Sequence, residues 1–136
     1  DINIKGVYRS IQAALPYLMK RERSRIVTFS SMWGQVGASC ESHYAASKGA
    51  VIALTQSLAK ELGPSGVRVN CVSPGTILTD MTAVLGQETL DALAEETPLE
   101  RNGSPEDAAR AAAFLCSEAA DFITGQVVAV NGGYIV

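Results

Sequence analysis

Three side chains in the first part of the sequence, Ser31, Tyr44 and Lys48, could together move a proton to or from a bound oxygen. Tyr44 and Lys48 are four residues apart in a strongly helical stretch, so both should lie on one helix face, about a turn apart. A free tyrosine has a pKa near ~10, and a neighbouring ammonium group favours the phenolate. Such a tyrosine could donate a proton to a carbonyl oxygen, or remove one from an alcohol, near neutral pH.

Each of these residues also fits a purely structural role. A tyrosine and a lysine at this spacing can form an amphipathic helix face from which the lysine extends into solvent. Ser31 follows a short apolar run, so it can cap the end of a strand. The same position, just beyond the carboxyl end of a parallel strand, is where ligands bind in open α/β sheets. The spacing alone therefore leaves both interpretations open.

The elements that must position these residues alternate between helix and strand. The apolar periodicity predicts helices at 2–21, 44–62 and 104–117, and strands at 25–30, 67–72 and 126–130. Pro16 should kink or loosen the first helix, and Ser104 is an N-cap for the last. A weaker helical pattern at about 86–95 lies within a polar segment, and a loop is expected after Ser31. Strands that alternate with helices imply right-handed parallel crossovers.

The predicted fold class is therefore α/β, as part of a Rossmann-like, doubly wound sheet of three parallel strands with flanking helices. A length of 136 residues with 47% hydrophobic and 18% charged residues is ordinary for one folded unit. The net charge of −3 and a pI near 5.1 disfavour binding to nucleic acid. The basic residues form one short cluster, Lys20, Arg21, Arg23 and Arg25.

The three cysteines, Cys40, Cys71 and Cys116, are widely separated and form no Cys-x-x-Cys pair, so we expect no metal site. We expect them to be small buried apolar residues in a reducing, cytoplasmic setting. No apolar run approaches the ~18 residues that span a bilayer, and no leader pattern opens the sequence. We therefore expect no membrane insertion.

The order of short sequence blocks is more specific than any one motif. It resembles the short-chain dehydrogenase/reductase family over the whole length, and among its members the bacterial 3-oxoacyl-[acyl-carrier-protein] reductases. The matching blocks are Ser30-Ser31, Tyr44-Ala-Ala-Ser-Lys48, Val69-Asn70-Cys71-Val72-Ser73-Pro74-Gly75, Thr79-Asp80-Met81, Pro98-Leu99-Glu100-Arg101, Gly103-Ser104-Pro105, Ile123-Thr124-Gly125-Gln126 and Val130-Asn131-Gly132-Gly133.

The resemblance implies an NAD- or NADP-dependent enzyme that reduces a ketone or 3-oxoacyl group, or oxidises a secondary alcohol, by hydride transfer. Tyr44 would be the general acid or base, Lys48 would favour its phenolate and hold the nicotinamide ribose, and Ser31 would hydrogen-bond the reacting carbonyl. Asn3 would support a water-linked proton relay. The loop that meets the nicotinamide would contain Pro74, Gly75, Ile77 and Thr79.

The resemblance also bears on partners and pathway. The substrate would be a small carbonyl, alcohol or acyl thioester, as in fatty acid biosynthesis. The family's usual dimer or tetramer would pair the helices at 2–21 and 44–62, and the last strand, with their mates. Relatives use arginines to dock the carrier protein where this sequence has Glu22 and Ser65. The nearby basic cluster could substitute for them.

Several residues keep a structural alternative beside the implied role. Asn3 can belong to the start of a helix, Ile77 can pack in a core, and Met32 and Trp33 can line either a pocket or a core. We interpret Asn70 and the pair Gly132-Gly133 as structural. We interpret His43, the single histidine, as a residue at the edge of a loop that takes no part in catalysis.

The family's chain is about twice this long, and its first half carries the Gly-rich turn that cradles the cofactor pyrophosphate. No such turn follows a strand in residues 1–136. We therefore expect this chain to be the catalytic half of a partial domain that lacks its dinucleotide-binding half, with a bare edge on the strand at 25–30. The alternative is a truncated, non-catalytic fragment that acts as a binding or oligomerisation module.

Overall fold

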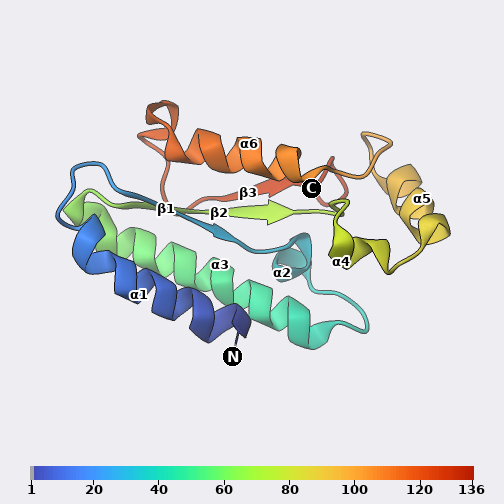
Figure 1. The fold of residues 1–136 in the computed structure, drawn as a ribbon, viewed down its shortest axis with the longest axis horizontal. Helices are drawn as coiled ribbons and strands as arrows, with labels where there is room; N and C mark the ends of the chain where they lie inside the picture. Colours follow the sequence, from blue (N-terminus) through green and yellow to red (C-terminus); the bar gives the residue numbers. More distant parts are fainter. Residues whose placement is uncertain (1) are drawn as a thin grey trace.

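The computed structural model describes residues 2–136 as one sheet between two helical layers (Figure 1). The strands are β1 (Arg25–Phe29), β2 (Arg68–Pro74) and β3 (Val127–Val130). They are parallel and lie in the order β1-β2-β3, with Thr28 opposite Cys71 and Val72 opposite Val128. The predicted three-stranded parallel sheet is confirmed. Within the described residues β1 pairs only with β2, which leaves its other edge unpaired.

Two long helices, α1 (Val7–Leu18) and α3 (Ser42–Leu62), cover one face of the sheet (Figure 1). Their shared core includes Ile11, Leu58 and Val69. Helix α6 (Pro105–Cys116) covers the other face through Leu115, which packs with Val72 and is fully buried. Burial of these apolar faces holds the three layers together.

The first helix differs from its predicted range of 2–21. A π-helical turn occupies Ile2–Gly6, and α1 then continues through Pro16 but ends at Leu18. Proline lacks an amide donor and has a fixed φ, so it is best tolerated near a helix end. Short 3-10 turns follow α3 at Gly63–Ser65 and α6 at Glu118–Ala120. No helix of the described residues is both long and apolar enough to cross a membrane.

Three further helices gather at the carboxyl edge of the sheet: α2 (Met32–Val36), α4 (Asp80–Ala83) and α5 (Gln87–Glu96) (Figure 1). Helix α5 confirms the helix that the weak apolar pattern predicted at about 86–95. Helix α2 occupies the segment after Ser31 that was expected to be a loop, and this expectation is wrong. A five-residue helix that contains Gly34 is too short to show a periodic pattern.

The N-terminus of α6 is capped as its sequence predicts. The Ser104 hydroxyl accepts a hydrogen bond from the Asp107 amide at 3.3 Å, and the Asp107 carboxylate accepts one from the Ser104 amide at 2.8 Å. Arg101 also donates to Asp107, at 2.8 and 3.2 Å. The hydrogen bond from Arg101, together with those from Ser104, lowers the pKa of the Asp107 carboxyl well below its usual range.

The expectation that all three cysteines are buried is correct only for Cys71. Cys116 is the last residue of α6 and is exposed, whereas the adjacent Leu115 is fully buried. Successive helical residues are rotated by about 100° about the axis, so one can face the sheet while the next faces away from it. Cys40 is exposed in the loop that precedes α3.

Candidate active site

Ser31 lies two residues after the end of β1, at the carboxyl edge of the sheet. It is buried and has an extended backbone, with φ −159° and ψ 155°, so it serves as the N-cap of α2. Its Oγ accepts a hydrogen bond from the Trp33 amide at 3.2 Å. Ser31 therefore caps the helix that follows the strand, whereas the sequence analysis allowed for a cap of the strand itself, and the residue also lines a cavity.

Tyr44 is the third residue of α3, and Lys48 lies one turn further along. The Nζ of Lys48 is 5.8 Å from the centre of the Tyr44 ring, which confirms that the two side chains share a helix face. The same ammonium donates a hydrogen bond to the carbonyl of Phe29 at 3.2 Å. Partial burial lowers the pKa of Lys48 from its ordinary value, opposed by the nearby Cys71.

Gly34 allows α2 and α3 to lie close enough to bring Ser31 near Tyr44 and Lys48. A Cβ at Gly34 would be 2.8 Å from the Lys48 carbonyl carbon and 2.6 Å from the Ser30 hydroxyl. That hydroxyl donates to the Lys48 carbonyl at 2.8 Å, which ties the end of β1 to α3. The sequence analysis did not identify this packing role of Gly34.

Asn3 reaches α3 through Ser47. The Asn3 amide donates to the Ser47 hydroxyl at 3.2 Å, and this hydroxyl donates to the Tyr44 carbonyl at 2.8 Å. The π-helical turn that contains Asn3 therefore lies beside the helix of Tyr44. Sequence reasoning missed Ser47. Its position three residues after Tyr44 was visible, but the contact with Asn3 joins residues 44 apart in the chain.

The segment after β2 leads into the helices that border the site. Pro74 ends β2, and a Cβ at Gly75 would lie 2.8 Å from the Asn131 Cα, so only glycine fits this crossing. Ile77 forms a bridge with Gly103 and accepts a hydrogen bond from Thr82 at its carbonyl. Thr79 is the N-cap of α4 and is exposed.

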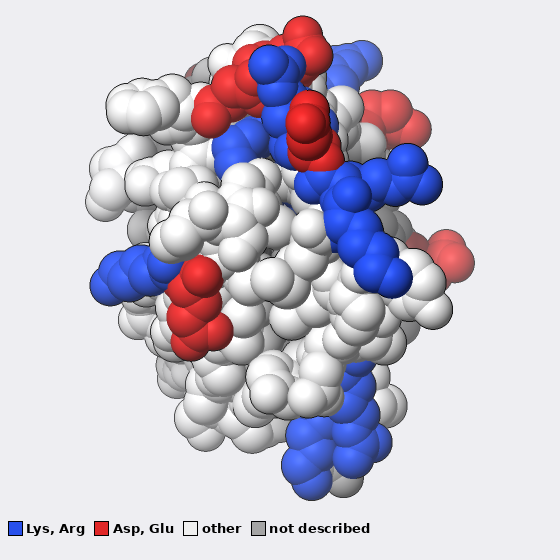
Figure 2. Space-filling model, turned by 90° about the vertical axis from the view of Figure 1, so that its left-hand side faces the viewer, with Lys and Arg blue, Asp and Glu red and all other residues white. Residues whose placement is uncertain are grey.

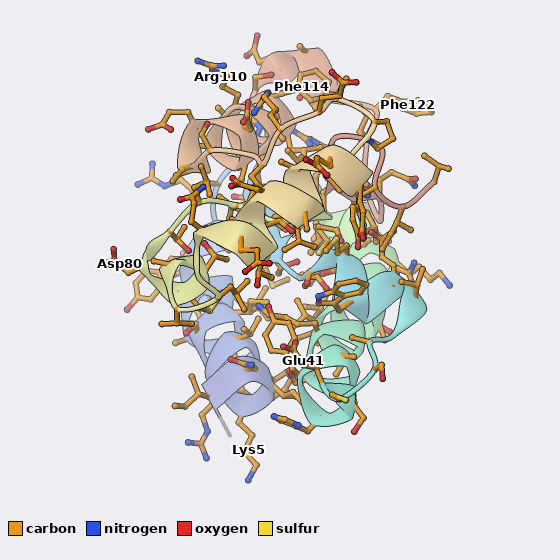
Figure 3. All side chains as sticks on the ribbon, turned by 90° about the vertical axis from the view of Figure 1, so that its right-hand side faces the viewer. Lys5, Glu41, Asp80, Arg110, Phe114 and Phe122 are labelled. Carbon is orange, nitrogen blue, oxygen red and sulfur yellow. The ribbon has the colours of Figure 1, made fainter. Side chains whose placement is uncertain are left out.

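A cavity of about 510 Å3 opens where these elements meet. Ser31, Tyr44 and Gly75 line it, whereas Lys48, Asn3, Pro74, Ile77 and Thr79 are not among its lining residues. Figure 3 looks onto this end of the molecule, with α4 and α5 above α1 and α3, and with Glu41 just before the start of α3. The lining residues are Ser31, Met32, Trp33, Glu41, His43, Tyr44, Gly75, Thr76, Met81, Thr82, Leu85, Thr89 and Leu93.

The two faces of this cavity differ in character. The hydroxyl-bearing residues Ser31 and Tyr44 line one side, and α4, α5 and the turn between them supply Met81, Leu85 and Leu93 together with Thr82 and Thr89. Such a pocket can orient a polar reacting group while apolar side chains contact the rest of a ligand. Trp33 and Met32 of α2 also line the cavity, but Met32 is only 3% exposed and so belongs to the core as well.

His43 is the second residue of α3 and is exposed, yet it also lines the cavity together with Glu41. A second cavity, of about 530 Å3, shares Thr76 but lies against Arg101 and Asn131. That cavity contains neither Ser31 nor Tyr44, so the 510 Å3 cavity is the better candidate for chemistry. The described residues form no group of His, Cys, Asp or Glu that could hold a metal ion.

Asn70 has the structural role predicted for it. Its side-chain amide donates to the Ile123 carbonyl at 2.8 Å, and its oxygen accepts from the Gln126 amide at 3.0 Å. Gly132 and Gly133 both adopt positive φ, at 64° and 88°, which only glycine adopts readily. They form a turn near the C-terminus.

Comparison with known proteins agrees with this architecture. A family model described as enoyl-(acyl carrier protein) reductase matches residues 1–135. The chain is 46% identical over 132 residues to 3-oxoacyl-[acyl-carrier-protein] reductase FabG of Aquifex aeolicus, covering 97% of this chain and 53% of that protein. It is 41% identical to the uncharacterized oxidoreductase YmfI of Bacillus subtilis, covering 98% of this chain and 55% of that one.

A solved short-chain dehydrogenase/reductase of the glucose/ribitol dehydrogenase type from Brucella melitensis has a TM-score of 0.94 and 45% identity, covering 99% of this chain and 54% of that one. A 3-oxoacyl-[acyl-carrier protein] reductase from Brucella melitensis has a TM-score of 0.91 and 39% identity, covering 98% of this chain and 51% of that one. The chain thus spans about half the length of the relatives it matches. With the fold and nearly all of its residues matched, the chain belongs to the short-chain dehydrogenase/reductase family and resembles its 3-oxoacyl-[acyl-carrier-protein] reductases.

Proposed function

We propose that this chain supplies the catalytic half of an NAD(P)-dependent oxidoreductase that reduces a 3-oxoacyl thioester or a related ketone, or oxidises the corresponding secondary alcohol. The observation that carries the proposal is the convergence of Ser31 and Tyr44 on one cavity, with the Lys48 ammonium 5.8 Å from the Tyr44 ring. The names of the 3-oxoacyl reductases among its relatives support this substrate class.

In this proposal Ser31 and Tyr44 act on the oxygen of the substrate. Hydride transfer to a carbonyl carbon places negative charge on that oxygen, and two hydroxyl donors that face it stabilise the charge. Tyr44 gives its proton to the oxygen during reduction and removes it during oxidation. Lys48 favours the phenolate that remains, because its ammonium lies over the ring.

Asn3 and Ser47 have a positioning role. Their hydrogen bonds fix the first turn of α3, which carries Tyr44. We assign to Asn3 the support of a water-linked route by which Tyr44 regains its proton. The amide and hydroxyl groups near the helix start provide the polar partners that an ordered water requires.

A nicotinamide cofactor, NADP or NAD, supplies the hydride when it is bound. The residues present fit such a group. Gly75 lines the cavity at the carboxyl end of β2, and Lys48 can donate to a ribose hydroxyl. Pro74, Ile77 and Thr79 would contact the nicotinamide from the segment that leads into α4. The pyrophosphate would be held by a dinucleotide-binding half outside residues 1–136.

The apolar side of the cavity suits the acyl part of such a substrate. Met81, Leu85 and Leu93 lie opposite the hydroxyl groups and would contact an alkyl chain. For the assembled protein we propose a homodimer or homotetramer, in which the exposed outer surfaces of α1 and α3 and the last strand meet their mates. The non-catalytic alternative is disfavoured because Ser31, Tyr44, Lys48 and Asn3 are all present, with Ser31 and Tyr44 on one cavity and Lys48 beside the Tyr44 ring.

The test compares Tyr44→Phe with Tyr17→Phe in the full-length protein that contains this chain. NADPH oxidation is measured with acetoacetyl-coenzyme A, a small 3-oxoacyl thioester. We expect Tyr44→Phe to lower kcat by at least about 100-fold, because the acid-base hydroxyl is lost while the ring remains. Tyr17 on α1 does not line the cavity, and Tyr17→Phe keeps the ring and removes only a hydroxyl, so this variant should keep wild-type turnover. Full activity of Tyr44→Phe would refute the assignment.

A further inference from the structure

The C-terminal turn of the chain contacts two different walls of the 510 Å3 cavity. The Tyr134 ring meets the Trp33 ring edge to face, with centroids 6.1 Å apart and planes at 88°. The Tyr134 hydroxyl donates a hydrogen bond to the Glu96 carboxylate at 2.8 Å. Trp33 belongs to α2 and Glu96 is the last residue of α5, so one side chain joins the two helices.

The position of Tyr134 is set by the turn that precedes it. The Asn131 side chain accepts a hydrogen bond from the Gly133 amide at 3.0 Å and donates to the Ile135 carbonyl at 2.8 Å. The Tyr134 amide donates to the Asn131 carbonyl at 3.1 Å. Together with the positive φ of Gly132 and Gly133, these bonds define one backbone path. The turn is therefore a built structure that presents the tyrosine in one direction.

The same turn fits closely against the segment that follows α5. A Cβ at Gly132 would lie 2.5 Å from the Thr97 methyl group, and one at Gly133 would lie 3.1 Å from the Pro98 ring. The Leu99 amide donates to the Gly132 carbonyl at 3.2 Å. The end of α5 is thus held both by backbone contacts and by the hydroxyl of Tyr134.

Helix α5 depends on contacts of this kind because little else buries it. Its ten residues include one buried side chain, Leu90, whose carbonyl accepts a hydrogen bond from Asn102. Thr89 and Leu93 of this helix line the cavity, as does Trp33 on α2 beside Ser31. A shift of α5 relative to α2 would therefore change the space available to a ligand.

We propose that Tyr134 is a positioning residue for substrate binding, which couples α2 to α5 through Trp33 and Glu96 and so sets the width of the cavity. This inference rests on the proposed function, in which that cavity receives the substrate. The Glu96 carboxylate raises the pKa of the Tyr134 phenol, so the phenol keeps the proton that it donates. Within the described part of the chain, Tyr134 and Glu96 form no hydrogen bond or ring contact with Ser31 or Tyr44, so their effect should fall on binding.

The kinetic test uses Tyr134→Phe and Glu96→Ala in the full-length protein, with acetoacetyl-coenzyme A as the probe. Each variant loses one exposed hydrogen bond, so we expect the KM for the probe to rise about 3- to 10-fold. The kcat and the KM for NADPH should stay at wild-type values. Glu96→Gln keeps an acceptor oxygen and should restore the wild-type KM. Tyr17→Phe and Glu95→Ala, both exposed, are the matched controls.

A second readout does not require turnover. We expect hydrogen exchange of the α5 amides to increase about 3- to 10-fold in Tyr134→Phe and Glu96→Ala, and to stay unchanged in Glu96→Gln and the controls. Trp33 is the only tryptophan of the 136 residues. Its fluorescence emission, obtained by subtracting the emission of a Trp33→Phe variant, should shift in Tyr134→Ala, because that variant loses the ring contact.

The two measurements separate the possible failures. If the wild-type protein does not reduce the probe, the proposed function fails for this substrate class, and the exchange data alone decide whether Tyr134 couples the helices. If α5 exchange rises while KM stays constant, the coupling exists but does not control substrate binding, and the inference is overturned. Unchanged exchange together with unchanged KM would also overturn it.

Discussion

Lys48 shows how folding and chemistry can place opposite demands on one residue. Its ammonium lies over the Tyr44 ring and bonds the Phe29 carbonyl, but partial burial disfavours the charged form and lowers its pKa. A lysine whose folded-state pKa is depressed destabilises the fold at every pH below that pKa. The penalty disappears as the pH rises from the folded-state pKa to the unfolded value of 10.5.

We therefore predict that Lys48→Met will lower turnover without lowering stability. Loss of electrostatic support for the Tyr44 phenolate should reduce kcat by at least about tenfold, the equivalent of one pKa unit. The thermal midpoint should match or exceed that of the wild type at neutral pH, and the difference should shrink toward strongly alkaline pH. Lys60→Met, at an exposed position of the same helix, is the control. A clear loss of stability in Lys48→Met would contradict this interpretation.

At the scale of elements, two glycines face each other where α2 packs on α3. A Cβ at Gly34 would be 2.8 Å from the Lys48 carbonyl carbon and 2.9 Å from its Cβ, both too close. A Cβ at Gly49 would find the Gly34 carbonyl oxygen at 3.4 Å, an ordinary contact. The same substitution should thus have opposite effects at two neighbouring positions.

We predict that Gly34→Ala destabilises the protein by about 1–3 kcal/mol, because α2 must move away from α3. Gly49→Ala should be neutral or stabilising by up to about 1 kcal/mol, because alanine favours a helix interior. Urea unfolding of both variants measures the difference. Turnover should fall only in Gly34→Ala, since that shift displaces Ser31 from Tyr44. Equal stability of the two variants would show that the interface is loose.

The contrast between α2 and α3 also shows what the sequence could predict. The 21 residues of α3 repeat an apolar pattern often enough to predict a helix, and the Tyr44-to-Lys48 spacing then follows from its geometry. Helix α2 is one turn long, and its stability comes from the Ser31 cap and the contact of Gly34 with α3. Its existence depends on tertiary structure.

The same reason explains why Tyr134 was missed. The sequence analysis identified the glycines before it, because glycine marks positive φ locally. Its contacts with Trp33 and Glu96 lie far away in the chain. A single sequence carries no local signal for such a pair. The proposed cofactor loop was predicted from the resemblance to the family and not from a local pattern. Of its predicted residues, only Gly75 lines the cavity.

At the scale of the whole molecule, the two ends of the sheet differ. Figure 2 shows the end where the strands begin, and acidic and basic side chains lie side by side there. Arg23 pairs with Glu118 at 3.4 Å, and Arg25 and Arg68 lie 3.4 and 3.8 Å from Asp121. Helices α2, α4 and α5, which contribute residues to the cavity, lie at the opposite end (Figures 1 and 3). A carrier protein bound to Arg23 and its basic neighbours would therefore not face the cavity of the same chain.

The unpaired edge of β1 bears on what residues 1–136 can do by themselves. The strand is apolar, its Phe29 is 46% exposed, and its only partner among the described strands is β2. Unpaired edges of this kind invite pairing with another chain. The relatives are about twice as long, with 53% of the Aquifex aeolicus protein covered by this chain. In our proposal the additional half pairs with β1 and holds the cofactor pyrophosphate.

We predict that residues 1–136, expressed alone, bind NADPH and NADH with Kd values above about 1 mM, because Gly75, Lys48 and Tyr44 can contact only the nicotinamide end. Calorimetric titration measures the binding, and light scattering measures self-association through the free edge. The full-length protein, titrated in parallel, should bind at least about 100-fold more tightly, since it adds the phosphate contacts at a helix N-terminus. Micromolar binding by the isolated residues would mean that the cofactor site is complete within them, and the division into a catalytic and a dinucleotide-binding half would then be wrong.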